Sequence, residues 1–356
     1  MAREAGLEGR QQQTRAPVTV SAPKGQEAMK AIVMHEFGGP EVLRYEEVPD
    51  PEPRPGEVLV ELRAAGLNHL DIWVRKGLPS VPKPRILGAD GAGVVAGLGE
   101  GVDGFAAGDR VVINPGIPHG DRITVIGEHT DGTCCELKAI PASQLYPLDD
   151  ALSFEDGAAF PLVFETAFRM LVTKAAVREG EWVLIWGIGG GVALAAFEIC
   201  RALSARTIVT SSSEEKLERA RALGADVTVN HADGDVVQAV KEATGGGVDI
   251  VVETVGEATW ERSLAAAGQE GRIVVCGATS GHSPPARLYR LWWKQLVIYG
   301  STMGLPSDFE GAYELVRSGR ARVHVDSTFP LADAALAHER LESGAQFGKV
   351  VLSIPG

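Results

Sequence analysis

Cysteine is scarce in this chain of 356 residues, which contains four. Cys134 and Cys135 are adjacent, and Cys200 and Cys276 fall in apolar segments that we expect to be buried. This distribution is not a disulfide framework, so it excludes the class of small disulfide-stabilised secreted proteins. It is typical of a reducing compartment, and we expect a cytoplasmic protein in which Cys200 and Cys276 are core residues.

Basic residues are also in deficit, because 34 Lys and Arg are outnumbered by 47 Asp and Glu and the formal net charge is −13. This charge argues against nucleic acid and anionic membrane surfaces as partners. The apolar window over residues 182–199 has four glycines in its middle and Glu198 near its end, so we do not expect a membrane span. A hydrophobic fraction of 45% provides an ample core, and the length suggests two domains.

The first 28 residues lack an apolar segment and any hydrophobic periodicity. Without an apolar h-region they are not a secretory signal, and their three glutamates argue against an organelle transit peptide. We predict that residues 1–28 are a disordered extension, or lie upstream of the true start codon, and that the folded chain begins at Met29.

A glycine-rich turn is the most informative feature that is present. Residues 181–196 (EWVLIWGIGGGVALAA) pass from an apolar, strand-like run through four glycines into an Ala-rich helix. Glycine lets the backbone approach a pyrophosphate, and the following helix N-terminus presents unpaired N–H groups to its charge. The segment predicts the phosphate-binding turn of a Rossmann unit, and a glycine turn that binds no nucleotide is the alternative.

Strands and helices alternate after this turn, as a doubly wound parallel sheet requires. We expect Ser213 to cap one of these helices and Gly224 to end it. The sequence therefore predicts an α/β fold with one dinucleotide-binding domain over residues 161–301. The expected strands are residues 207–210, 227–229, 249–253, 272–277 and 296–300, and the expected helices are residues 213–223, 236–243 and 260–267.

The sequence on either side of this domain has a different composition and a different pattern of predicted elements. Residues 29–160 alternate short β runs with Pro- and Gly-rich turns, which predicts a β-rich, barrel-like domain. Residues 302–356 show an amphipathic helix pattern near 332–341 and end in a strand-like run at 349–352. We expect this final segment to return and complete the N-terminal domain.

Several motifs occur in an order that is similar to a known family. They are residues 38–43 (GGPEVL), 65–71 (AGLNHLD), 88–95 (GADGAGVV), 104–111 (GFAAGDRV), 158–161 (AAFP), the glycine turn and 300–304 (GSTMG). Over residues 29–356 the chain resembles the medium-chain dehydrogenase/reductase superfamily, and within it the zinc-independent quinone oxidoreductase branch. The resemblance implies a Rossmann sheet joined to a GroES-like barrel domain.

Zinc-dependent members of this superfamily bind a catalytic metal through a Cys, a His and a further Cys or acid. The matching positions here carry Asn68, Ala89 and Leu162, and none is a good zinc ligand. Residues 115–133, where a structural zinc lobe would carry four cysteines, contain none. We therefore expect no metal. The remaining metal candidates, whose spacing fits no standard zinc site and which we expect to be ordinary loop side chains, are His119, Glu128, His129, Cys134 and Cys135.

The cofactor preference is inferred from the end of the second Rossmann strand, where NAD-specific domains carry an acid. Ser211 occupies that position, Ser212 follows, and Lys216 lies about one helical turn further on, which suits a 2′-phosphate. We expect NADPH in preference to NADH, with His231 beside the adenosine phosphate; a solvated Lys216 and an ordinary surface His231 are the alternative. The other residues expected at the cofactor are Thr166, Gly187, Gly190, Gly191, Val192, Val255, Ala278 and Met303.

The expected chemistry follows from the missing metal, since nothing evident in the sequence would polarise a simple alcohol or its carbonyl. Hydride addition to a quinone or an α,β-unsaturated carbonyl is easier, because the charge delocalises onto an oxygen that needs only hydrogen-bond donors. The resemblance places Asn68 and His69 on the substrate side and Thr166 near the nicotinamide, and the proton comes from water or His69.

We therefore predict an NADPH-dependent reductase of a small electrophilic quinone or enone, active as a homodimer or homotetramer. Alcohol or aldehyde dehydrogenase activity on the same fold, and a non-catalytic NADPH-binding protein, are the alternatives. Asp71 is expected to cap or orient local backbone, and Asp90 to make a buried hydrogen bond. Trp292 and Trp293 are expected to pack inside the protein, with a substrate pocket or an interface as the alternatives.

Overall fold

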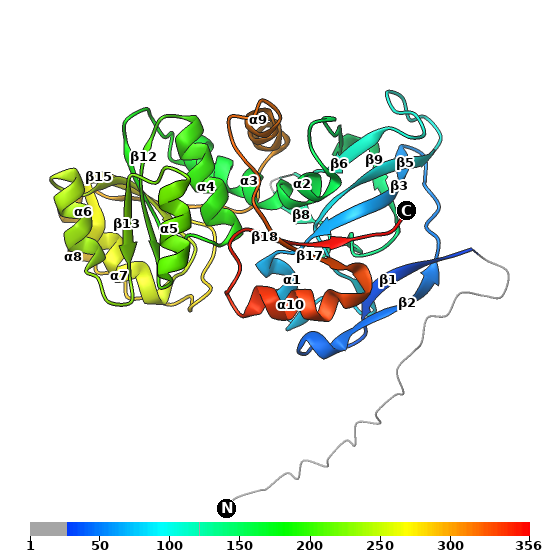
Figure 1. Ribbon diagram of the computed structural model, residues 1–356, viewed down its shortest axis with the longest axis horizontal. Helices are drawn as coiled ribbons and strands as arrows, with labels where there is room; N and C mark the ends of the chain where they lie inside the picture. Colours follow the sequence, from blue (N-terminus) through cyan, green and yellow to red (C-terminus); the bar gives the residue numbers. More distant parts are fainter. Residues whose placement is uncertain (1–26, 121) are drawn as a thin grey trace, which may run out of the picture.

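The computed structural model describes residues 27–120 and 122–356, so the predicted extension over residues 1–28 lies almost entirely outside the described residues. Figure 1 shows two lobes side by side. One contains a parallel sheet flanked by helices, and the other is built from β-strands that come from both ends of the chain. Among the described residues, no helix is long and apolar enough to cross a bilayer.

The first lobe contains a six-stranded parallel sheet in the order β13-β12-β11-β14-β15-β16. The chain starts at the centre with β11, fills one side, and then crosses to β14, which is the order of a doubly wound Rossmann sheet. The predicted α/β fold class is confirmed. The strands are β11 (Trp182–Ile185), β12 (Arg206–Ser211), β13 (Val227–Asn230), β14 (Val248–Glu253), β15 (Ala267–Val275) and β16 (Val297–Gly300).

The helices around this sheet begin and end for local reasons. The Ser213 hydroxyl accepts a hydrogen bond from Lys216 N at 3.4 Å and caps its helix, as predicted, and Gly224 follows the helix end with a φ of +99°. The helix expected at residue 260 begins at Glu257, because the chain turns at Gly256. The helices are α4 (Gly191–Ala202), α5 (Glu214–Ala222), α6 (Val236–Thr244), α7 (Glu257–Ala266) and α8 (Leu288–Lys294).

The second lobe is organised around a seven-stranded sheet in which β10-β6-β5-β3-β18-β17 form the main path and β9 also pairs with β3. A three-stranded sheet, β2-β1-β4, and the hairpin β7-β8 complete it. The strands from the N-terminal part are β1 (Ala28–Met34), β2 (Leu43–Pro49), β3 (Glu57–Gly66), β4 (Arg85–Ile86), β5 (Asp90–Leu98), β6 (Arg110–Ile113), β7 (Gly116–His119), β8 (Arg122–Val125), β9 (Leu137–Pro141) and β10 (Leu145–Pro147).

The C-terminal segment joins this second lobe, as Figure 1 shows. Strand β18 (Lys349–Ser353) lies antiparallel to β3, with Val351 opposite Gly66, and β17 (Val325–Pro330) runs parallel to β18. Helix α10 (Ala334–Glu342) connects the two strands and packs on them. The last strand therefore starts at the junction of the lobes, where Lys349 can reach residues of the N-terminal part.

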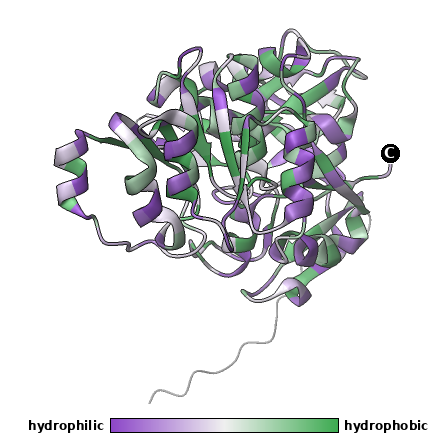
Figure 2. Ribbon diagram, turned by 60° about the vertical axis from the view of Figure 1, so that its left-hand side comes forward, coloured by the Kyte–Doolittle hydropathy of each residue, from purple (hydrophilic) through white to green (hydrophobic). Residues whose placement is uncertain are grey.

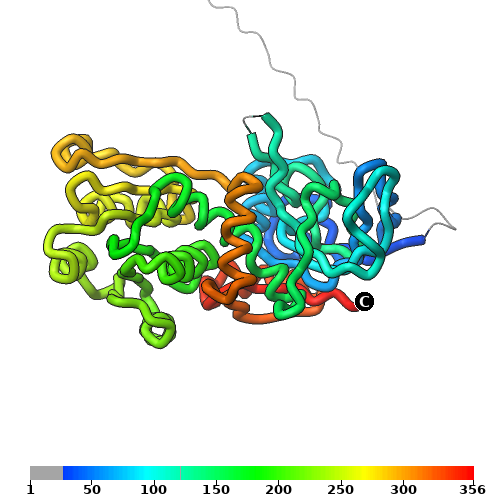
Figure 3. The backbone as a smooth tube through the Cα atoms, turned by 90° about the horizontal axis from the view of Figure 1, so that it is seen from above, coloured from blue at the N-terminus to red at the C-terminus, as the bar shows by residue number. Residues whose placement is uncertain are grey.

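The two lobes are joined by a continuous apolar core. Ala64 of β3, Phe160 and Val183 of β11 are all fully buried in one cluster that extends across both lobes. Seen from above in Figure 3, α9 lies between the lobes, and it packs against α3. The remaining helices are α1 (His69–Arg75), α2 (Phe154–Ala159), α3 (Pro161–Phe168) with its π-helical extension Arg169–Lys174, α9 (Pro306–Arg317) and the short turns Pro40–Val42, Ala142–Gln144 and Leu331–Asp333.

Hydropathy follows this arrangement, except at α8. Figure 2 shows apolar strands enclosed by helices with hydrophilic outer faces. The prediction that Trp292 and Trp293 pack inside the protein is wrong, because their exposed fractions are 65% and 70%. The sequence pattern could not reveal this, since an aromatic pair on a helix is compatible with either a core or an outward face.

Candidate active site

One cavity of about 470 Å³ lies where the two lobes meet, and it is lined by residues from both. It brings together the substrate-side and cofactor-side residues that were inferred from the sequence. Ala278 does not line it, although its neighbours Gly277 and Thr279 do, because Ala278 lies against the Gly256 turn. The predicted residues that line the cavity are Asn68, His69, Thr166, Gly187, Gly190, Gly191, Val192, Ser211, Ser212, Lys216, His231, Val255 and Met303.

The glycine turn has the geometry of a phosphate-binding loop. Gly187 and Gly189 adopt φ values of +68° and +118°, which side-chain-bearing residues rarely adopt. The backbone N–H of Ile188 donates to the Thr210 carbonyl at 2.7 Å and fixes the turn to β12. Gly190 is the N-cap of α4 and carries no side chain, so the first N–H groups of this helix face the cavity without a side-chain cap and are suited to an anion.

The end of β12 is polar and has no carboxylate at Ser211. The Ser211 hydroxyl accepts a hydrogen bond from Ser213 N at 3.1 Å, and His231 Nδ1 lies 3.1 Å from Thr210 Oγ1. Lys216 Nζ donates to the carbonyl of Gly344 at 2.6 Å, so this side chain spans from the Rossmann lobe to the C-terminal segment. Burial lowers the pKa of both Lys216 and His231. At neutral pH His231 is therefore a neutral hydrogen-bonding group.

A buried carboxylate supports the opposite wall of the cofactor side. Glu253, at the end of β14, accepts hydrogen bonds from Val255 N at 2.9 Å and Gly256 N at 3.0 Å. It also accepts from the Thr259 hydroxyl at 2.7 Å and from Ser263 at 2.5 Å. These bonds fix the turn that presents Val255 to the cavity. The sequence analysis did not identify Glu253. The available signal was an acidic residue at the end of an apolar strand.

The substrate side begins at the N-terminus of α1. Asp71 Oδ2 accepts from Asn68 N at 2.7 Å, and its Oδ1 accepts from Gly88 N at 3.0 Å, so the prediction that Asp71 orients local backbone is confirmed. Asp71 is buried, which raises the pKa of its carboxyl to about 6. His69, the first residue of α1, keeps an exposed edge at the rim of the cavity and packs edge-on against Trp73.

A charged network lies beneath Asn68. Asp90 is fully buried, and its Oδ1 accepts from Leu162 N at 2.9 Å, which confirms the predicted buried hydrogen bond. Its Oδ2 accepts from Asn68 Nδ2 at 2.9 Å and from Lys349 Nζ at 2.9 Å. Lys349 Nζ also donates to Asn68 Oδ1 at 2.6 Å. The sequence analysis did not identify Lys349 as a site residue. The available signal was one charged residue at the start of the apolar last strand.

This network engages the amide group of Asn68 on both sides. Its oxygen accepts from Lys349, while its nitrogen donates to Asp90 and, at 3.5 Å, to the Gly66 carbonyl. The amide is therefore directed at protein partners rather than free to face a substrate oxygen. The ammonium of Lys349 also affects His69, because loss of water contacts and then this positive charge lower the pKa of the imidazole.

The expected metal candidates are dispersed. Within residues 27–120 and 122–356, no three His, Cys, Asp or Glu side chains lie close enough together to hold a metal ion. His129 Nδ1 accepts from Val125 N at 3.0 Å and its side chain is exposed. Cys135 is buried and its Sγ donates to the Leu137 carbonyl at 3.2 Å. These contacts are those of a hydrogen-bonded loop.

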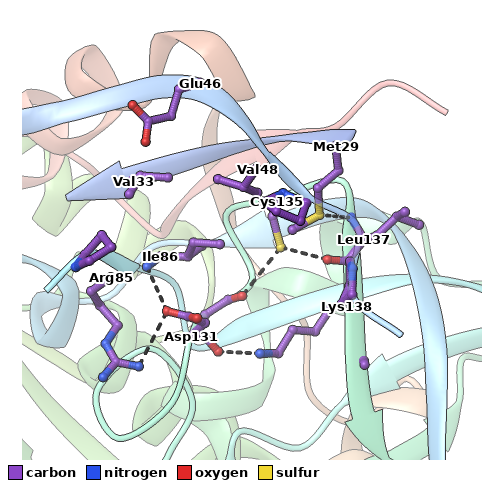
Figure 4. Close-up of a pocket in the computed structure, with 15 residues that line it drawn as sticks. Met29, Val33, Glu46, Val48, Arg85, Ile86, Asp131, Cys135, Leu137 and Lys138 are labelled. Atoms are coloured by element: carbon purple, nitrogen blue, oxygen red, sulfur yellow. Dashed lines mark hydrogen bonds and ion pairs between the residues drawn. The ribbon is translucent and has the colours of Figure 1, made fainter. Parts of the chain in front are cut away.

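A second cavity, of about 290 Å³, lies in the β lobe beneath β1 and β2 (Figure 4). Arg85 and Asp131 form an ion pair at 3.5 Å on its wall, and Lys138 Nζ donates to the Asp131 carbonyl. None of the residues predicted for the cofactor or the substrate lines it. The interlobe cavity is therefore the candidate active site.

Comparison with known proteins agrees with this architecture. Residues 54–150 match the family model of the alcohol dehydrogenase GroES-like domain, and residues 191–318 match that of the zinc-binding dehydrogenase. The quinone oxidoreductase of Pseudomonas aeruginosa is 34% identical over 334 residues, which cover 91% of this chain and 99% of that protein. The chain belongs to the medium-chain dehydrogenase/reductase superfamily, in its quinone oxidoreductase-like branch.

Other relatives of this medium-chain oxidoreductase carry different descriptions. A zinc-type alcohol dehydrogenase-like protein of Schizosaccharomyces pombe is 35% identical, with 92% of this chain and 99% of that protein covered. The crystal structure of an NAD-dependent alcohol dehydrogenase is 44% identical, with a TM-score of 0.89 and coverage of 92% of this chain and 100% of that one. A mycobacterial quinone oxidoreductase structure is 30% identical, with a TM-score of 0.77 and coverage of 91% and 99%.

Proposed function

We propose that this enzyme is an NADPH-dependent reductase that transfers hydride to a quinone or an α,β-unsaturated carbonyl without a metal. The observation that carries the proposal is the interlobe cavity, which joins a phosphate-binding turn to a polar floor made by Asn68 and Lys349, with Asp90 buried beneath them. NADPH, when bound, would supply the hydride. The chain would supply the orientation of both reactants and the polar groups around the reducible oxygen.

The residues fit a bound dinucleotide. The glycine turn offers the N–H groups of α4 to a pyrophosphate. Ser211, Ser212 and Lys216 offer two hydroxyls and a cation to a 2′-phosphate, and β12 ends without the acid that would bind a ribose 2′-hydroxyl. Thr166, which is 5% exposed and lines the cavity, would lie beside the nicotinamide. The residues at the end of β12 therefore support binding of NADPH in preference to NADH.

A second candidate function is alcohol or aldehyde dehydrogenase activity with NAD. The observation that favours it is the 44% identity to a structure described as an NAD-dependent alcohol dehydrogenase. The residues at the substrate side count against it, because Asn68, Ala89 and Leu162 offer no metal-ligand set to activate an alcohol. A non-catalytic role is the third alternative, and loss of cofactor turnover in every assay would favour it.

The test is a cofactor oxidation assay with the purified full chain. We expect NADPH oxidation with 1,4-benzoquinone or trans-2-hexenal, a weaker rate with NADH, and little reduction of NADP⁺ or NAD⁺ by ethanol or benzyl alcohol. Turnover of alcohols with NAD⁺ that exceeds quinone and enone reduction would instead support the second candidate. Binding of NADPH without any turnover would support the third.

A matched pair of glycine variants links any activity to this cavity. In Gly189→Ala the new methyl group would meet Lys216 and the Gln346 carbonyl at 3.0–3.2 Å, and NADPH binding should weaken. Gly180→Ala also places alanine at a positive φ, but into open space outside the cavity, and should bind NADPH like the wild type. Equal effects of the two variants would contradict the assignment of the cofactor site.

We further propose that residues 29–160 with 302–356 form the GroES-like catalytic unit, and that residues 161–301 form the cofactor unit. The pairing of β18 with β3 and the separate parallel sheet support this division. The four free thiols support a cytoplasmic location, and the net charge of −13 supports a small-molecule substrate rather than nucleic acid or a membrane as partner.

A second copy of the chain is the proposed macromolecular partner, giving a homodimer or homotetramer. Strand β16 forms an edge of the Rossmann sheet, with Val297 and Ile298 exposed on it, and the outer face of α8 exposes Trp292 and Trp293. An exposed edge strand beside such an apolar patch suits pairing with its own copy about a two-fold axis. Sedimentation should show a dimer or tetramer that Trp293→Glu dissociates, and a monomeric wild type would contradict the proposal.

A further inference from the structure

A buried ammonium group, that of Lys349, lies in the candidate active site. Lys349 is 4% exposed and lines the same cavity as Thr166 and the glycine turn. Its Nζ atom lies 2.6 Å from Asn68 Oδ1 and 2.9 Å from Asp90 Oδ2. A lysine is rarely so deeply buried unless an anion is paired with it, and Asp90 is that anion.

The network holds the ammonium in one place. Asp90 is itself fixed by the Leu162 N–H at the start of α3, and Asn68 is fixed by Asp71 at the start of α1. The aliphatic stem of Lys349 passes along the beginning of α4, where a Cβ built on Gly191 would lie 3.3 Å from Lys349 Cδ. Three elements of the two lobes therefore position this side chain between the phosphate-binding turn and Asn68.

One N–H of this ammonium remains for a ligand. Lysine has three N–H donors, and within the described chain the hydrogen bonds of Nζ go to Asn68 and Asp90. Asn68 has no such spare capacity, because Asp90 and Gly66 accept from its amide nitrogen. Lys349 is thus the strongest hydrogen-bond donor among the polar groups of the floor, since its donor carries a full charge.

We infer that Lys349 is a catalytic residue that donates a hydrogen bond to the carbonyl oxygen of the acceptor and stabilises the negative charge that hydride addition places on that oxygen. This inference rests on the proposed function. With an enone, the hydride pair forms a C–H bond at the β-carbon, the C=C pair shifts toward the carbonyl, and the oxygen becomes an enolate. The acceptor gains two electrons, the nicotinamide loses them, and water supplies the proton at the α-carbon.

The same arrangement serves a quinone, where the oxygen of the hydroquinone anion takes the charge before water protonates it. A preorganised donor in a site with little water is worth far more than the same donor in solution. Asn68 and Asp90 then act as positioning residues that hold Lys349. His69, whose pKa is lowered, would remain neutral beside the substrate and would not compete for the charge.

The test compares hydride transfer in a single turnover with NADPH binding, in wild type and Lys349→Met. The acceptors are 1,4-benzoquinone and trans-2-hexenal, and NADPH binding is followed by its fluorescence without an acceptor. We expect the single-turnover rate at saturating NADPH to fall about 10²–10³-fold, while the dissociation constant of NADPH changes little. Lys138→Met, which removes a lysine from the other cavity, should keep the wild-type rate.

Removal of Lys349 alone leaves the Asp90 carboxylate buried without its cation and could prevent folding. The double variant Asp90→Asn/Lys349→Met removes both charges, and if it binds NADPH like the wild type it should show the same loss of rate. Added propylammonium should restore part of the rate in Lys349→Ala.

Three results would overturn the inference in distinguishable ways. A wild type that reduces neither acceptor would refute the proposed function, and the inference with it. An active wild type with an unchanged rate in Lys349→Met would refute the inference alone. A loss confined to NADPH affinity, with an unchanged single-turnover rate, would assign Lys349 to the cofactor phosphates instead.

Discussion

We predict that the buried imidazole of His338 makes the folded protein less stable at acidic pH, and the contacts of that residue give the magnitude. His338 lies on α10, is 1% exposed, and its Nδ1 accepts a hydrogen bond from Arg75 Nη1 at 3.0 Å. Burial, and then the Arg75 guanidinium, lower the pKa of the imidazole from 6.5 to about 3, while Glu342 acts weakly in the other direction. The contact fastens α10 to α1, the helix whose N-terminus carries Asn68 and His69.

The folding stability decreases as the pH falls because the chain takes up a proton at this imidazole when it unfolds. Below pH 6.5 the unfolded chain protonates this imidazole and the folded chain does not, so stability is intact above pH 6.5 and is lost as the pH falls toward 3. Between pH 7 and pH 5 the loss amounts to about 2 kcal/mol. For a chain of 356 residues this corresponds to a decrease of roughly 2–4 °C in Tm.

The variant His338→Gln keeps an oxygen that can accept from Arg75 but cannot titrate. We expect it to be less stable than the wild type at pH 7 and to lose less stability than the wild type between pH 7 and pH 5. Thermal unfolding of both proteins across that range measures the difference, and His282→Gln, at an exposed histidine, is the matched control.

The comparison must be made between variant and wild type because another group acts oppositely over the same range. The pKa of Asp71 is raised from 3.8 to about 6, so folding takes up a proton there and its contribution to stability increases as the pH falls. That contribution is common to both proteins and cancels in the difference. A His338→Gln variant whose Tm falls with pH as steeply as that of the wild type would refute the reasoning.

Three further predictions concern the active site. Ser211→Asp should weaken NADPH binding roughly 10–100-fold and favour NADH, because a carboxylate repels the 2′-phosphate. Binding titrations at equal ionic strength test this prediction. Tighter binding of NADH than of NADPH by the wild type would contradict it. Asp90→Asn should cost about 3–5 kcal/mol of unfolding free energy by leaving Lys349 unpaired, and urea unfolding should show partial recovery when Lys349→Met is added. Elemental analysis of the purified protein should find no stoichiometric zinc, since Asn68, Ala89 and Leu162 are poor zinc ligands. One zinc ion per chain, together with loss of activity when a chelator is added, would contradict this prediction.

Some features of this enzyme were determined by residues that are close in the sequence. The strand, glycine turn and helix over residues 181–196 form as expected, because strand composition, positive φ values and helix starts are local properties. Ser213 caps α5 and Asp71 orients the start of α1 for the same reason, since each bonds to backbone within three residues. The alternation of strands and helices was enough to establish the doubly wound sheet.

The chemistry of the cavity floor was decided only by the tertiary structure. Lys349 lies 281 positions from Asn68, and the two meet because β18 pairs with β3 at the junction of the lobes. That contact gives the Asn68 amide a hydrogen bond to Lys349, which no local pattern could indicate. The outward face of Trp292 and Trp293 was likewise decided by how α8 sits on the sheet. Local residues select the elements, whereas long-range packing selects which side chains meet and which stay exposed.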